Sequence, residues 1–162
     1  MRDLAAGIVA VLLLLVAASL ATTLRSYRRR RQQARDSERA LGRVVIAELP
    51  TADDLVLVSQ DDHRFYHGER AIAKDLIVAV RMLINGSPIA SYVSRRHAAS
   101  TPPPTSFEDL PEGIARDRWD VAVETVAGTT LIECGAIRER VSQELARTVF
   151  DAIKKGLEQR DR

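Results

Sequence analysis

The segment DDHRFYHGE at residues 61–69 gathers side chains that could bind a metal ion or move a proton. In an extended strand, His63 and His67 point to the same face but lie about 13 Å apart, too far to share one metal ion, whereas a tight turn would bring them together. The spacing is not that of a zinc-binding signature. We therefore expect an exposed hairpin with solvated charges. The alternative is a metal site that uses Asp62, His63 and His67.

Cys134 is the only cysteine of the chain and the obvious candidate for a nucleophile. A nucleophile needs a base beside it, and no histidine is near Cys134 in the sequence. Its neighbours in LIECGAI are mostly apolar, which predicts a buried and unreactive thiol. The chain also lacks GxSxG, HExxH and P-loop motifs. The sequence thus predicts neither an enzyme nor a bound cofactor.

Positive charge is concentrated in RSYRRRRQQAR, which begins at Arg25. Each arginine near a bilayer attracts anionic headgroups by roughly 1 kcal/mol, and tyrosine is typical of the same interface. The residues predicted to contact anionic lipid are Arg25, Tyr27, Arg28, Arg29, Arg30, Arg31 and Arg35.

Residues 4–24 precede this run and read LAAGIVAVLLLLVAASLATTL, 21 positions without a charge. A helix of this length spans about 30 Å, the thickness of a bilayer core, which predicts a transmembrane helix. The alternative is a cleaved secretory signal ending near Ser19–Ala21, and the arginines that follow oppose it. They also predict the orientation: residues 1–3 outside, residues 25–43 as a basic juxtamembrane segment and residues 44–162 in the cytoplasm. We expect a single-pass protein of the cell inner or plasma membrane with a monomeric anchor.

The formal net charge of +2 hides an uneven distribution of charge. Residues 25–43 carry +6, whereas residues 44–162 carry −4. A mildly acidic domain has no electrostatic footprint for DNA or RNA. We therefore expect no nucleic-acid partner, and instead another membrane or cytoplasmic protein.

Short β-branched runs separated by turn residues fill most of the remaining chain. Asn85-Gly86 between two of them is the strongest hairpin signal. Residues 75–84 also fit a helical period, although their β-branched content favours a strand. In WDVAVETV, Trp119 alternates with Asp120 as expected of a half-buried strand. The strands expected on this basis cover residues 44–49, 55–60, 64–67, 77–84, 89–93, 119–126 and 129–133.

Two further segments complete the predicted architecture. Residues 95–118 contain TPPPT, whose prolines cannot join a strand ladder, and we expect a proline-rich loop there. Residues 137–157 carry apolar side chains every four positions, which predicts an amphipathic helix. The predicted fold class is α+β: a transmembrane helix, then a β-rich sheet or barrel closed by the C-terminal helix.

This order of elements resembles the pleckstrin-homology-like (PH-like) domains of bacterial membrane proteins. The resemblance rests on DLVLVSQDDHRFYHGERAIAKDLIVAVRM, on RWDVAVETVAGTTLIECG and on the final helix. It implies a scaffold for binding, and hence a non-catalytic binding or scaffolding module that could serve as an accessory subunit of a membrane complex. A small enzyme or metal-dependent sensor using Asp61–His67 is the alternative. The loops PTADD and QDDH are acidic where the family would bind phosphoinositide with lysine and arginine, which argues against that ligand.

Overall fold

The structure, a computed structural model, describes residues 2–51, 55–96 and 117–162, with side chains from residue 13 onward. Residue 1 of the predicted outer terminus and residues 97–116 of the predicted proline-rich loop lie outside the described part of the chain. The chain divides into two compact units, Met1–Ala40 and Leu41–Arg162.

The first unit is one helix, α1, Arg2–Ala40. Among the residues that the structure describes, no helix is apolar over a length that could cross a membrane. The predicted transmembrane helix at residues 4–24 is therefore wrong, and so are the single-pass localisation and the topology derived from it. In the described part of this helix the uncharged side chains end at Leu24, and Arg25 begins the arginine run.

The second unit begins with an antiparallel sheet of four strands in the order β1-β2-β3-β4. The strands are β1 Val44–Pro50, β2 Leu55–Gln60, β3 Arg64–His67 and β4 Arg70–Ala73. Alternation along the strands sends Leu49, Val58, Phe65 and Ile72 into the core, where all four side chains are buried.

A second antiparallel sheet has the order β6-β5-β7-β8. Its strands are β5 Ile77–Ile84, β6 Ser87–Val93, β7 Arg118–Thr125 and β8 Gly128–Ala136. Between β5 and β6, Asn85 and Gly86 have φ values of 51° and 81°, as the predicted hairpin requires. A short 3₁₀ turn at Lys74–Leu76 precedes β5, so the alternative of a helix over residues 75–84 is wrong.

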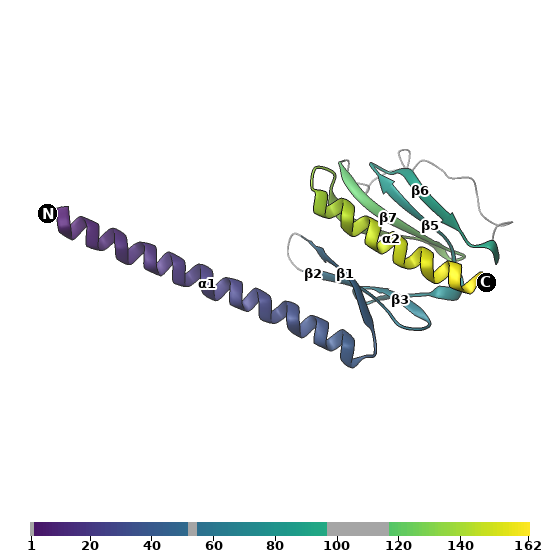
Figure 1. Ribbon diagram of the computed structural model, residues 1–162, viewed down its shortest axis with the longest axis horizontal. Coiled ribbons are helices and arrows are strands. Elements are labelled where there is room, and N and C mark those ends of the chain that lie inside the picture. Colours follow the sequence, from purple (N-terminus) through teal and green to yellow (C-terminus); the bar gives the residue numbers. More distant parts are fainter. Residues whose placement is uncertain (1, 52–54, 97–116) are drawn as a thin grey trace. The chain divides into compact units, whose positions relative to one another are not determined.

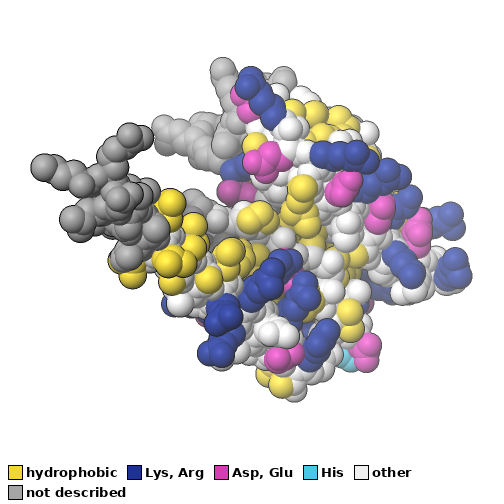
Figure 2. Space-filling model, turned by 60° about the vertical axis from the view of Figure 1, so that its left-hand side comes forward, with side chains coloured by type: hydrophobic (Ala, Val, Ile, Leu, Met, Phe, Trp, Pro, Cys, Tyr) yellow, Lys and Arg dark blue, Asp and Glu magenta, His cyan; other side chains and the backbone are white. Residues whose placement is uncertain are grey.

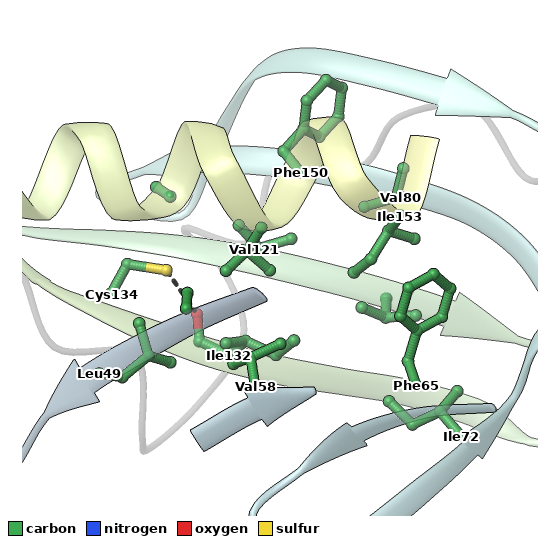
Figure 3. Close-up of a cluster of buried hydrophobic side chains, with 14 of the residues drawn as sticks. Leu49, Val58, Phe65, Ile72, Val80, Val121, Ile132, Cys134, Phe150 and Ile153 are labelled. Carbon is green, nitrogen blue, oxygen red and sulfur yellow. Dashed lines mark hydrogen bonds between the residues drawn. The ribbon is translucent and has the colours of Figure 1, made fainter. Parts of the chain in front are cut away.

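The C-terminal helix α2, Arg140–Arg160, crosses strands of both sheets and closes the core between them (Figure 1). It begins and ends three residues later than the predicted 137–157. Its buried stripe includes Ala146, Val149, Phe150 and Ile153, and Figure 3 shows Phe150 and Ile153 above side chains from the sheets. The unit thus combines one helix with two antiparallel sheets around a single core.

The prediction that the strand beginning at Trp119 is half-buried is wrong. All five residues from Trp119 to Val123 are buried. β7 is an interior strand, paired with β5 on one side and β8 on the other. Its core face carries Trp119, Val121 and Val123, and its opposite face carries Asp120 and Ala122.

Candidate functional site

Asp61, in the predicted site segment, organises the turn between β2 and β3. Its Oδ1 accepts hydrogen bonds from the backbone amides of His63 at 2.8 Å and Arg64 at 2.6 Å. The Tyr66 hydroxyl donates to Oδ2 at 2.7 Å. These bonds, led by the one from Tyr66, lower the pKa of Asp61 to about 2. The carboxylate therefore serves the turn itself and is occupied.

Lys74, the residue directly after β4, stabilises the same turn. Its Nζ donates to the carbonyl oxygen of Asp61 at 2.6 Å and to Oε1 of Gln60 at 3.1 Å. The ammonium also lies 4.7 Å from the centre of the Phe65 ring, within reach of a cation–π contact. Burial lowers the pKa of Lys74. Lys74 thus has a structural role in this turn.

The structure does not bring the predicted metal ligands together. Asp62 and His63 are exposed in the turn, whereas His67 is half-buried at the end of β3. Burial, followed by the charge of Arg70, lowers the pKa of His67. Within the described ranges, no group of three or more His, Cys, Asp or Glu side chains is placed to hold a metal ion.

Cys134 is buried among apolar side chains of the core, as Figure 3 shows. Its Sγ lies 3.6 Å from the carbonyl oxygen of Ile132, to which the thiol donates. Burial raises the pKa of this thiol to about 12. A group that stays protonated and inaccessible is a poor nucleophile, in agreement with the predicted unreactive thiol.

A charged cluster on the outer face of the second sheet was not predicted as a site. We call it the sheet-face cluster; its members are Arg81, Arg118, Asp120, Glu124 and Glu133. The register places Asp120 directly opposite Glu133, so both carboxylates lie on one face of the sheet. Arg81 pairs with Glu124 through both carboxylate oxygens, one contact measuring 3.2 Å.

Arg118 is shared by the two opposed carboxylates of this cluster. Its Nε lies 2.7 Å from Asp120 Oδ1 and its Nη1 lies 2.9 Å from Glu133 Oε2. The Asp120 side chain is 0% exposed, whereas that of Glu133 is 59% exposed. Burial, only partly offset by Arg118, raises the pKa of Asp120 to about 6.

The sequence contained a signal for this cluster. Arg81 interrupts the otherwise apolar run IVAVRMLI, and Asp120 alternates with the core residues of β7. A charge inside an interior strand requires a partner on the same face. The identity of that partner depends on which strands are neighbours. The order β5-β7-β8 cannot be read from the local sequence of any one strand.

The arginine run on α1 is the largest concentration of one charge in the described chain. Arg25 and Arg28–Arg31 are exposed, Tyr27 is 51% exposed and Arg35 is half-buried. Successive helical residues rotate by about 100°, so four consecutive arginines surround the helix with charge. Just before them, large apolar side chains are exposed at Leu13, Leu14, Leu15, Val16, Leu20 and Leu24. Figure 2 shows yellow apolar side chains adjoining dark-blue basic ones.

Comparisons with known proteins found no match to the chain among protein-family models, curated proteins or solved structures.

Proposed function

We propose that the protein is a non-catalytic binding module that attaches to anionic lipid headgroups through the arginine run of α1. The observation that carries this proposal is the exposure of Arg25 and Arg28–Arg31 directly after exposed leucines. Basic side chains supply electrostatic attraction to phosphate headgroups, and apolar side chains beside them add contact at the bilayer surface. Attachment to the headgroup layer does not require the helix to cross the bilayer.

For residues 44–162 we propose a PH-like domain that holds a protein partner. Two four-stranded antiparallel sheets closed by a C-terminal helix support this assignment. The acidic turn at Asp61-Asp62 supports a protein over a phosphorylated ligand, because its carboxylates repel phosphate. The alternative, an enzyme or metal-dependent sensor built on Asp61–His67, gains no support, since Asp61 is occupied by the turn.

Vesicle binding tests the role of the arginine run. The full chain is incubated with sedimenting vesicles of purely zwitterionic phospholipid or of the same lipid mixed with phosphatidylserine. We expect preferential binding to the anionic vesicles, weakening as salt is raised. Replacing Arg28–Arg31 by glutamine should remove about 4 kcal/mol of attraction, close to a thousandfold in the partition coefficient.

A matched variant controls for the change in net charge. Arg64, Arg138, Arg140 and Arg147 are four exposed arginines of the second unit. Replacing them by glutamine removes the same four charges but should leave vesicle binding within about threefold of the original. Equal losses for the two variants, or equal binding to zwitterionic vesicles, would contradict the proposal.

A further inference from the structure

We propose that Asp120 is a buried proton-binding site that makes the stability of residues 41–162 depend on pH, with the protonated form the more stable one. The proposal is independent of lipid binding. It rests on the geometry of the sheet-face cluster and concerns a group to which neither the predicted site nor the proposed function gives a role.

The surroundings of Asp120 offer its charge too little compensation. From its own strand it faces Arg118 and, further along, Glu124; β5 contributes Arg81 and β8 contributes Glu133. Arg81 is engaged by Glu124. Among the described residues, the remaining cation beside Asp120 is Arg118, which also pairs with Glu133. The uncharged thiol of Cys134 in β8 is close enough to sense the charge of Asp120.

Hydrogen bonds do not compensate for the burial of the ionised Asp120 carboxylate either. Within the described part of the chain, Arg118 is the one donor beside the Asp120 carboxylate: its Nε lies 2.7 Å from Oδ1 and lowers the pKa, whereas Oδ2 has no hydrogen-bond partner. An ionised carboxylate in a dry site needs several donors. Protonation removes the charge and leaves the ion pair between Arg118 and the exposed Glu133 intact.

The direction of the effect follows from proton linkage. The pKa of Asp120 rises from 3.8 to about 6 on folding. Between these values the folded state binds a proton that the unfolded state has lost, so stability falls as pH increases. One such proton changes the unfolding equilibrium about tenfold per pH unit and about a hundredfold across the window. Above pH 7 both states are ionised and the change is complete.

His67 acts in the opposite direction and must be separated from Asp120. Its pKa is lowered by burial, so its contribution to stability increases as pH rises towards 6.5. A comparison of the original chain with Asp120→Asn cancels this contribution, since both proteins keep His67.

Equilibrium unfolding of the full chain in urea at pH values from 4.5 to 7.5 tests the proposal. Trp119, the only tryptophan, lies next to Asp120 and is buried, so its fluorescence reports unfolding. We expect the unfolding constant of Asp120→Asn to be only about sixfold smaller than that of the original protein near pH 4.5. Near pH 7.5 its unfolding constant should be about a hundredfold smaller. A ratio of the two unfolding constants that stays the same at every pH overturns the proposal.

Two further measurements protect the test against a variant that fails to fold. In the original full chain, the ¹³C shift of the Asp120 side-chain carboxyl should titrate with a midpoint at pH 5 or above. A midpoint below pH 5 overturns the proposal. Glu133→Gln should move this midpoint to lower pH, because the charge of Glu133 opposes ionisation of Asp120. An unchanged or higher midpoint contradicts the opposed-carboxylate geometry.

Discussion

At the scale of single residues, two glycines of β8 both have a positive φ angle but have different surroundings. Gly128 has a φ of 144° and Gly135 a φ of 112°, both in the region that L side chains rarely adopt. A Cβ at Gly128 would meet nothing within 4 Å, whereas one at Gly135 would collide with Oγ of Ser142 at the start of α2. Gly135 therefore permits both the chain's local path and the close approach of the helix.

The two positions give a matched pair of substitutions. Gly128→Ala should cost about 1 kcal/mol of unfolding free energy, which is the backbone strain alone. Gly135→Ala adds the displacement of Ser142 and should cost about 1–3 kcal/mol more. Urea unfolding followed by Trp119 fluorescence measures both. Equal losses at the two glycines would show that the contact with Ser142 relaxes without cost.

At the scale of elements, the carboxylate of Asp161 joins the end of α2 to the second sheet, beside the contact of Arg160 with the carbonyl oxygen of Ile77. Asp161, the C-cap of α2, accepts hydrogen bonds from the Tyr92 hydroxyl at 3.1 Å, the Ser94 hydroxyl at 2.8 Å and the Arg95 amide at 2.9 Å. These donors come from the end of β6 and the residues that follow it. The contact joins the helix to the edge strand of the second sheet.

We expect Asp161→Ala to release this end of α2. The loss of three hydrogen bonds to a charged, partly exposed group should lower the unfolding free energy by about 1–3 kcal/mol. Asp151→Ala on the same helix is the control, since its contact with Arg147 is exposed and 3.8 Å long; it should cost less than about 0.5 kcal/mol. Hydrogen exchange of the last turn of α2 should increase only for Asp161→Ala.

The elements that the sequence identified best are those with a local chemical cause. Asn85-Gly86 predicted the β5–β6 hairpin because both residues tolerate the positive φ that the turn requires. β4 was missed because it has only four residues, of which Arg70 and Ala71 are exposed, and so shows little apolar pattern. Its pairing with β3 depends on the turn at Gly68 and on tertiary context.

The candidate site was predicted less well, because its contacts depend on residues that are distant in the sequence. The turn at Asp61-Asp62 was predicted where it lies, but the bonds of Asp61 were not, because Tyr66 and Lys74 reach Asp61 only once β2, β3 and β4 are assembled. Asp120 and Glu133 are thirteen residues apart in the sequence and become opposed only through the register of β7 and β8. The periodicity of a single segment predicts a strand but not the strand with which it pairs.

At the scale of the whole molecule, a single apolar core joins both sheets and α2. Among the described side chains, the residues of that core lie between Ala47 and Leu157. Strands of the first sheet supply Leu49 and Phe65, those of the second supply Val80 and Val121, and α2 supplies Ile153. A shared core of this kind is expected to unfold in one cooperative step.

A fragment of residues 41–162 should therefore fold without α1. Its thermal unfolding should show one transition, with the same midpoint whether it is followed by Trp119 fluorescence or by far-ultraviolet circular dichroism. Different midpoints for the two probes would mean that the sheets unfold separately. A fragment without a transition would show that α1 is required for the fold.

The buried Cys134 has a consequence for kinetics. Because it is the only thiol, any reaction with a thiol reagent reports one position in the core. The reagent reacts with the thiolate. In the folded protein the raised pKa keeps Cys134 protonated, whereas in an opened core its pKa returns towards the ordinary value and thiolate forms. When closing is fast relative to labelling, the labelling rate measures the free energy of opening, as amide exchange does. The chain thus carries a natural probe, one thiol, whose labelling rate reports how often the core opens under native conditions, without any substitution in the sequence.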